Sequence, residues 1–226
     1  MPSRTLKIIA LLTMALDHIG ALYEIEALRV IGRIAFPLFA FMIAEGMYFS
    51  RNKLNYIKKL FIFAIISEPF FNLFFNKISF ISNEGFMNFV NVDHQNVFFT
   101  LGFGALMCYI STLNIDSIKK AIYFILICIV ATIIKQDYFL IGSVYIYFLF
   151  IFRNKYGYVA ITTFVFTVCV YIGLPIYYLI GTLSSLIFIK LYNGEKGSFK
   201  NIKYNVIFQN FTYIFYPLHL LLLSIL

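Results

Sequence analysis

Apolar runs long enough to cross a lipid bilayer follow one another along almost the whole chain. A helix needs about 20 mainly apolar residues to span the hydrocarbon core, because it rises only about 1.5 Å per residue. The succession predicts an all-α, polytopic transmembrane helical bundle of about nine spans, with eight or ten as alternatives. The predicted spans cover residues 5–23, 29–49, 56–75, 95–112, 119–134, 138–152, 156–172, 175–192 and 206–226.

Composition supports a membrane protein. The chain is 62% hydrophobic and 12% charged, whereas a soluble domain is about 45–50% apolar and about 25% charged. No polar segment is long enough to build a separate soluble domain, so residues 1–226 are expected to form a single transmembrane domain. The first apolar run contains an Asp-His pair and no cleavage pattern of small residues follows it, which predicts a retained span and not a signal peptide.

The three cysteines, Cys108, Cys128 and Cys169, all lie inside apolar runs. Their spacing matches neither a disulfide framework nor a metal site. We therefore expect small buried side chains and no metal.

Basic residues gather on alternate connections between the spans, which predicts a cytoplasmic N-terminus. The net charge of +8 follows from this asymmetry, so no nucleic-acid partner is expected. The connections predicted to lie inside hold 14 of the 18 Lys and Arg residues: Arg4, Lys7, Arg51, Lys53, Lys58, Lys59, Lys119, Lys120, Arg153, Lys155, Lys190, Lys196, Lys200 and Lys203.

Asp17 and His18 are two adjacent ionisable residues inside the first span. They lie about 9 Å below its outer end, at about 1.5 Å per residue. An ionisable group in hydrocarbon is costly, so it needs a partner or a polar cavity. Histidine is suited to proton transfer because its pKa lies near neutrality, and a carboxylate can orient it or stabilise its cation. Neighbouring side chains on a helix point about 100° apart, so the two cannot face one neighbour in the same way. The alternative is a structural histidine.

Other polar residues fall at a similar depth under the predicted topology. Arg33 either snorkels to the surface or pairs with Asp17, and Pro37 loosens the turn beside it. A shared polar cavity in the outer half of the membrane explains this agreement, although the residues that open helices also suit capping or interface anchoring. The expected cavity residues are Arg33, Glu68, Asn72, Gln95, Asn96, Asp137, Tyr138, Tyr216 and His219.

The predicted inner surface carries two groups of polar and basic residues. Such loops bind anionic lipid headgroups, and they can also hold the phosphates of a nucleotide-like donor. Glu45, near the same surface, is expected to pair with Arg51 or a nearby lysine. The expected donor-binding residues are Arg51, Lys58, Lys59, Asn193, Gly194 and Lys196.

Six motifs in this order resemble the TraX family: LKIIALLTMALDHIG, RVIGRIAFPLFAFMIAEG, FAIISEPFFNL, QNVFFTLG, LYNGEKG and FYPLHLLLL. That family is linked to N-terminal acetylation of F-pilin and is related to membrane acyltransferases that use cytosolic acetyl-CoA. The resemblance implies an acetyltransferase of the bacterial cytoplasmic (inner) membrane, with Asp17 and His18 as its catalytic pair. The implied acceptor is an exported peptide or glycan. The family often has an aspartate where this chain has Asn72, which leaves room for a different substrate.

Two other functions are compatible with the same residues. Buried Asp, His, Glu and Arg also suit a proton-coupled transporter, although the two halves of the chain show no matching pair of broken helices. A non-enzymatic partner of a secretion or conjugation system is the other alternative. The identity of the acceptor, the choice between N- and O-acetylation, the acyl-chain preference and the oligomeric state are not determined by the sequence.

Overall fold

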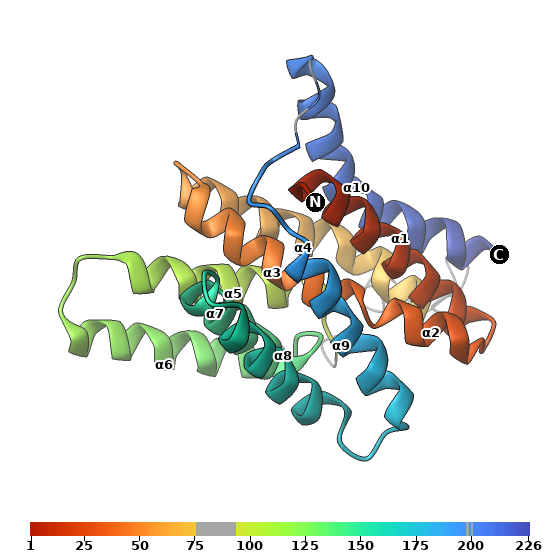
Figure 1. The fold of residues 1–226 in the computed structure, drawn as a ribbon, viewed down its shortest axis with the longest axis horizontal. Coiled ribbons are helices and arrows are strands. Elements are labelled where there is room, and N and C mark those ends of the chain that lie inside the picture. Colours follow the sequence, from red (N-terminus) through yellow and green to blue (C-terminus); the bar gives the residue numbers. More distant parts are fainter. Residues whose placement is uncertain (76–93, 198, 200) are drawn as a thin grey trace, which may run out of the picture.

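The computed structural model describes residues 1–75, 94–197, 199 and 201–226, and these form a bundle of α-helices (Figure 1). The helices in the described part of the chain correspond one to one with the nine predicted spans, except that the second span is divided in two. They are α1 (Ser3–Leu22), α2 (Glu26–Gly32), α3 (Ala35–Phe49), α4 (Lys53–Phe75), α5 (Val97–Thr112), α6 (Ser117–Ile133), α7 (Phe139–Phe152), α8 (Tyr156–Tyr171), α9 (Ile176–Lys190) and α10 (Ile202–Ile225).

The division between α2 and α3 confirms the loosened turn predicted near Arg33. Arg33 and Ile34 form a turn between the two helices. Pro37 follows in the first turn of α3, where a missing backbone N–H leaves no intrahelical hydrogen bond unmade. The break frees the segment around Arg33 to face the end of α1.

Polar residues begin several of the other helices. Asn96 precedes α5, and its side chain accepts a hydrogen bond from the backbone N–H of Phe98. Asp116 caps α6 in the same way through the N–H of Ile118. These contacts satisfy backbone donors that a helix N-terminus leaves without a partner. The predicted capping role of Asn96 is therefore confirmed.

Three described helical stretches are long and apolar enough to cross a membrane: Ser3–Leu22, Glu26–Phe49 and Lys203–Ile225. The helices α5, α7, α8 and α9 are apolar but contain only 14 to 16 residues. At about 1.5 Å per residue they measure about 21–24 Å, less than the hydrocarbon core of about 30 Å. Their length favours a locally thinned bilayer around this side of the bundle.

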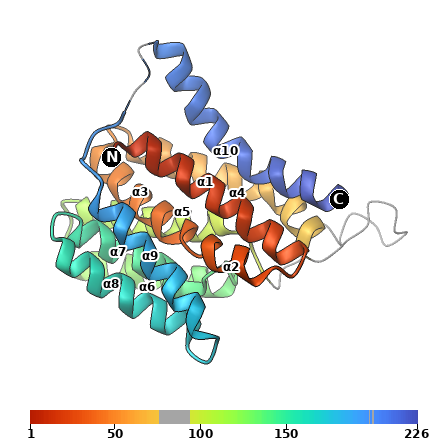
Figure 2. The same cartoon turned by 45° about the vertical axis from the view of Figure 1, so that its right-hand side comes forward.

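Helix α3 lies at the centre of the bundle and contacts α1, α5, α7 and α9. Small residues such as Ala40 and Ala44 on α3 are fully buried, which lets neighbouring helices approach closely. Helix α6 lies at one edge, against α5 and α7. The C-terminal half of α10 runs beside α1 and α4, while its first turns project away from the bundle (Figures 1 and 2).

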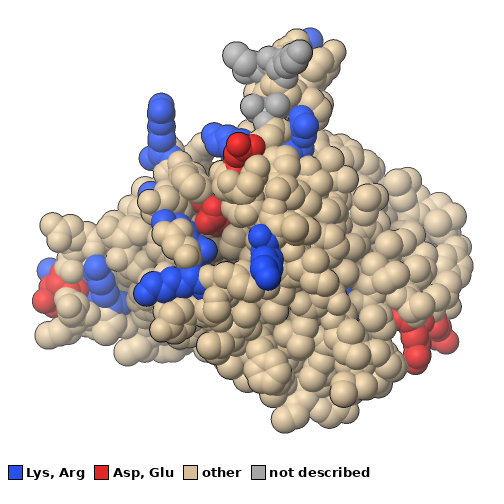
Figure 3. Space-filling view, in the orientation of Figure 1, with Lys and Arg blue, Asp and Glu red and all other residues tan. Residues whose placement is uncertain are grey.

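Charged side chains are unevenly distributed over the surface. On the face shown in Figure 3, Lys and Arg occur over the left, middle and top of the molecule together with a few acidic side chains, and the charged side chains at the right end are acidic. The loop after α9 is joined to the N-terminus on the basic side, because Ser3 N–H donates to Glu195 O and Arg4 N–H donates to Lys196 O. The N-terminus and the loop after α9, which are both expected to lie in the cytoplasm, therefore meet at one surface.

Two side-chain predictions were wrong. Glu45 lies 3.8 Å from Arg153, not beside Arg51, because the end of α3 approaches the α7–α8 connection. Of the three cysteines, Cys108 is buried as predicted, whereas Cys128 is partly exposed and Cys169 is exposed.

Candidate functional site

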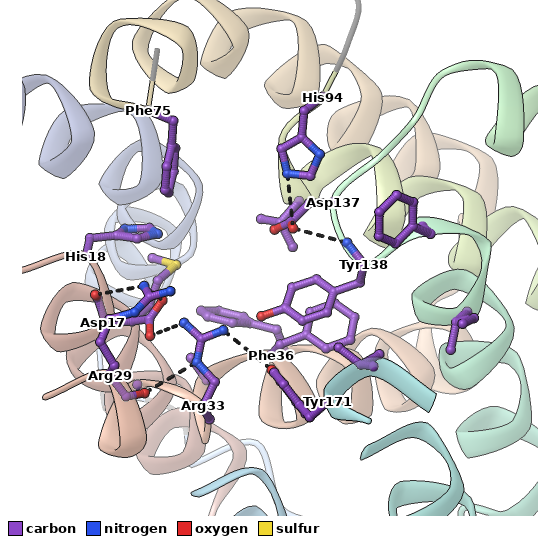
Figure 4. A pocket seen from close by; sticks show the side chains of 18 of the residues that line it. Asp17, His18, Arg29, Arg33, Phe36, Phe75, His94, Asp137, Tyr138 and Tyr171 are labelled. Atoms are coloured by element: carbon purple, nitrogen blue, oxygen red, sulfur yellow. Dashed lines mark hydrogen bonds and ion pairs between the residues drawn. The ribbon is translucent and has the colours of Figure 1, made fainter. Parts of the chain in front are cut away.

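A cavity of about 400 Å³ lies at the end of the bundle predicted to face outward. Its walls come from the end of α1, from α2 and α3, from the end of α4, from the segment entering α5, from the α6–α7 turn, from the end of α8 and from Tyr216 of α10. Figure 4 shows His18 and Phe75 on one side, His94, Asp137 and Tyr138 on the other, and Arg33 below them. A cavity with polar side chains in its walls is therefore present at this end of the bundle, and its location on the outer side stays a prediction.

Asp17 forms ion pairs with two arginines of α2 and the α2–α3 turn. Its Oδ2 lies 2.9 Å from Arg29 Nη1, and its Oδ1 accepts a hydrogen bond from Arg33 Nη2. Arg33 Nε also donates to the backbone carbonyl of Arg29 at 3.3 Å. The structure thus pairs Arg33 with Asp17, which was one of the two sequence-based interpretations, and adds Arg29, which the sequence analysis missed.

The close contact between α1 and α2 depends on glycine at the crossing point. A Cβ built on Gly32 overlaps the side chain and Cα of Asp17. A Cβ on Gly20 would lie 2.9 Å from Arg29 N and 2.9 Å from Ile25 O. Because glycine has no side chain at these two positions, the two helices can pack closely enough to form the Asp17 ion pairs.

His18 points away from Asp17 and contacts His219 on α10. Its Nδ1 lies 2.6 Å from Nε2 of His219 on α10, and the two rings stack with centroids 4.9 Å apart. His219 Nδ1 lies 2.8 Å from the carbonyl oxygen of Phe215. A carbonyl only accepts, so His219 Nδ1 is the donor in that contact.

This hydrogen-bond chain assigns the tautomers of the two rings when both are neutral. His219 Nε2 must be the acceptor, so His18 Nδ1 carries a proton and donates it. Nε2 of His18 is then left with a lone pair. Phe74, Phe75 and Tyr216 surround the ring, with the two phenylalanine centroids at 5.6 Å, so little water reaches it except through the cavity.

The expected support of His18 by Asp17 takes a different form in the structure. His219 is the hydrogen-bond partner of His18, whereas both carboxylate oxygens of Asp17 bond to arginines. The roughly 100° between adjacent helical positions explains the separation. Asp17 therefore orients α2 and Arg33, and His219 orients His18.

His94 and Asp137 form a second histidine–carboxylate pair on the opposite wall. His94 Nε2 lies 3.5 Å from Asp137 Oδ1, and the side chains are 45% and 31% exposed. The hydrogen bond to Asp137 and the charges of Asp137 and Glu68 raise the pKa of His94 above its usual value. His94 was not among the residues predicted for the site; its position directly before a helix start was the available signal.

Three tyrosines complete the walls. Tyr138 stacks on Phe36 with ring centroids 3.8 Å apart, and Tyr171 lies with its hydroxyl 3.5 Å from Arg33 Nη1. Tyr216 packs edge-on against the His18 ring. One end of the cavity therefore has neutral hydrogen-bond donors, the hydroxyls of Tyr138 and Tyr171, and a cationic donor, the guanidinium of Arg33.

Several other predicted cavity residues lie behind the walls. Glu68 accepts hydrogen bonds from the backbone and side chain of Asn96, which also donates to Ala64 O at 2.8 Å. Gln95 N–H donates to Lys135 O at 3.1 Å and so joins the α5 entrance to the α6–α7 turn. Of the predicted set, Arg33, Asp137, Tyr138 and Tyr216 line the cavity, while Glu68, Asn72, Gln95, Asn96 and His219 support it from behind.

The predicted donor-binding residues lie at the opposite end of the bundle. Each of the six has an exposed side chain or backbone there, and Asn193 N–H is bonded to Met1 O at 3.1 Å. The cavity described above is not lined by them. The donor-binding residues and the cavity lie at different depths along α1. Arg4, which is bonded to Lys196 O, and His18 are about 21 Å apart at about 1.5 Å per residue. The residues in question are Arg51, Lys58, Lys59, Asn193, Gly194 and Lys196.

Known proteins resemble this chain as follows. A "Probable fimbrial assembly protein FimC, serogroup H1" from Dichelobacter nodosus is 34% identical over 120 residues. The matched stretch covers 49% of this chain and 47% of the FimC protein, so the chain spans about half the length of that relative. No solved protein structure matches the chain. The family model described as "TraX protein" matches residues 3–226, nearly the whole chain. The chain therefore belongs to the TraX family.

Proposed function

We propose that this protein is a membrane acetyltransferase that moves an acetyl group from cytosolic acetyl-CoA to an amine or hydroxyl acceptor at the outer side of the membrane. One observation carries the proposal: the hydrogen-bond chain from Phe215 O through His219 to His18 leaves His18 Nε2 unprotonated in a cavity. An imidazole nitrogen held in this way is suited to act as a base or as a nucleophile toward a thioester.

The remaining walls provide what an acyl transfer needs. A tetrahedral intermediate carries an oxyanion, which nearby donors and cations stabilise. Arg33 is held at the cavity floor by Asp17, and Tyr138 contributes a hydroxyl from the facing wall. Asn96, which was expected in the cavity, is bonded to Glu68 and Ala64 and lies behind the wall. Arg33 and Tyr138 are therefore the oxyanion donors in this proposal.

The donor is proposed to approach from the basic end. Exposed Arg51, Lys58 and Lys59 are available for phosphate groups, and Lys196 in the loop after α9 adds a further exposed cation. Coenzyme A joins its phosphates to its sulfur through a long, thin arm, which here must extend about 20 Å along α1 at about 1.5 Å per residue. Because the cavity does not reach the basic end, donor binding in this proposal includes a separation of the helices between the two ends.

The FimC relative suggests the class of acceptor. Its printed name refers to fimbrial assembly, which is compatible with the exported acceptor that the family resemblance implies. We therefore propose an exported peptide, presented at the outer mouth of the cavity, as the first acceptor to test.

The experiment uses the purified full chain reconstituted in lipid vesicles with labelled acetyl-CoA. Synthetic peptides with a free N-terminus, glucosamine and water serve as the acceptor probes. Consumption of acetyl-CoA and labelling of a probe is the expected result. The absence of acetyl-CoA consumption with every probe would contradict the proposal. Transmembrane uptake of a probe without acetyl-CoA would instead indicate a carrier.

A further inference from the structure

The pair of His94 and Asp137 faces His18 across the cavity. Figure 4 shows both residues projecting from the wall opposite His18. His94 Nε2 is 3.5 Å from Asp137 Oδ1, so in the neutral ring Nε2 is the protonated nitrogen and Nδ1 is left as the acceptor. With 45% of its side chain exposed, His94 lies at the mouth, whereas His18 is 8% exposed and lies inside. The cavity thus has an inner and an outer imidazole.

The backbone that positions Asp137 is strained. Lys135, Tyr138 and Phe139 have φ values of 51°, 59° and 49°, in the left-handed region that residues with a side chain adopt rarely. Such conformations persist only where the surroundings enforce them, and they concentrate at functional sites. In this conformation the turn leads directly into α7 and places Asp137 and Tyr138 in the cavity wall.

A set of hydrogen bonds holds this turn against the segment that carries His94. Gln95 and Gln136 form an isolated β-bridge, with Asp137 N–H donating to Gln95 O at 2.8 Å. Gln136 Nε2 donates to Ser143 Oγ at 2.7 Å, and Thr100 Oγ1 donates to the carbonyl of Asp137. His94 and Asp137 are therefore brought together by a rigid scaffold.

Charges around His94 favour its protonated form. Asp137 faces it from the α6–α7 turn and Glu68 from α4, and both raise the pKa of His94. The other nearby surface of α4 presents the ring of Phe71, 5.6 Å from that of His94. An imidazole in such surroundings is a better proton acceptor than a free histidine.

We propose that His94, positioned by Asp137, is the base that removes the proton of the incoming acceptor, and that His18 is the nucleophile that carries the acetyl group. This rests on the proposed acetyltransferase function. His18 Nε2 forms a bond to the acetyl carbon while the carbon–sulfur bond breaks and the thiolate leaves. The acceptor nitrogen or oxygen then bonds to that carbon, the carbon–Nε2 bond breaks and its electron pair returns to Nε2. The acceptor's proton goes to His94 Nδ1 and from there to water at the mouth.

The test separates the two half-reactions. Exchange of labelled coenzyme A into acetyl-CoA needs only the His18 step, and transfer to a peptide probe needs both. We expect His94→Gln to lower peptide transfer about 100-fold, the lower range for loss of a general base, while exchange falls less than about threefold. Transfer to hydroxylamine, which needs no base at neutral pH, should be affected as little as exchange. The pH profile of peptide transfer by His94→Gln should also lack the ionisation of His94 that the wild-type profile is expected to show.

Asp137→Asn and Asp116→Asn form a matched pair, because Asp116 is an exposed helix cap that asparagine can replace. Only the first should lower peptide transfer. Wild-type peptide transfer and an unchanged pH profile in His94→Gln would overturn the assignment of His94 while leaving the proposed function intact. Equal loss of exchange and transfer in His94→Gln would also overturn it. Absence of both reactions in the wild type would instead remove the proposed function.

Discussion

His18 Nδ1 and His219 Nε2 lie 2.6 Å apart, although the two residues come from opposite ends of the chain. The contact needs the C-terminal half of α10 to lie beside the end of α1, as Figure 2 shows. Because His219 Nδ1 donates to Phe215 O, the direction of the hydrogen bond between His219 and His18 is fixed as well. The position of α10 therefore sets which nitrogen of His18 is left to react.

Variants of His219 test this positioning role. His219→Leu removes the acceptor for His18 Nδ1, and we expect acetyl transfer to fall by about 100-fold or more. His219→Gln keeps a side-chain oxygen that can accept the same hydrogen bond, and we expect it to retain activity within about tenfold of the wild type. Nitrogen-15 NMR of His18 should show the Nδ1-protonated tautomer in the wild type and in His219→Gln, and a mixture in His219→Leu. Equal activity and equal tautomers in both variants would show that His219 has no such role.

The ion pairs of Asp17 are expected to stabilise the fold. Exposed ion pairs contribute up to about 1 kcal/mol, whereas breaking a buried pair costs about 3–5 kcal/mol. The Asp17 and Arg33 side chains are only 14% and 11% exposed, so we expect Asp17→Asn to lower the free energy of unfolding by about 2 kcal/mol. Thermal unfolding in detergent measures the change, with Asp116→Asn as the control. A loss no larger than that of the control would mean that the cluster contributes nothing to stability.

The crossing of α1 and α2 is tested by a pair of glycine variants. Gly32→Ala would place a methyl group against Asp17, so we expect the helices to separate and both the stability and the acetyl transfer to fall. Gly157→Ala has no neighbouring atom within 4 Å and lies in the first turn of α8, where alanine favours the helix. We expect Gly157→Ala to be neutral or slightly stabilising. Similar thermal unfolding of the two variants would contradict the close packing described for Gly32.

The His94–Asp137 pair predicts a pH-dependent contribution to stability. The pKa of His94 is raised in the folded protein, so the protonated form is stabilised by folding. This contribution is present below the ordinary histidine pKa of about 6.5 and disappears as the pH rises through the raised pKa. Both groups are partly exposed, so it amounts to about 0.2–1 kcal/mol. The difference in unfolding free energy between wild type and His94→Gln should be larger at about pH 6 than at about pH 9. A difference that grows with pH would have the wrong sign.

The spans could be predicted from the sequence because apolar length is a local property. Depth along a helix was equally predictable, and it correctly grouped Asp17, Arg33 and Asp137 at one end. Depth does not specify which way a side chain points, so Glu68 and Asn96 were expected in the cavity and lie behind its wall. The direction of a residue depends on how the helices pack around one another.

The missed residues depend on long-range contacts. Arg29 lies at the end of a predicted span, where an outward-pointing arginine is the ordinary expectation, and only the α1–α2 packing turns it to Asp17. The partner of His94 is set by a turn whose left-handed residues have none of the glycines that would mark it in a sequence. Similarly, no residue near His219 in the sequence indicated that its ring would meet His18.

The most direct test of the central claim is the rate of label transfer from acetyl-CoA to the acceptor probes by His18→Ala compared with wild type. The variant removes the nitrogen on which the proposed chemistry depends and leaves the Asp17 ion pairs in place. We predict that the rate falls by at least about 100-fold while thermal unfolding in detergent still shows a folded protein. Transfer by a folded His18→Ala variant at the wild-type rate would contradict the account.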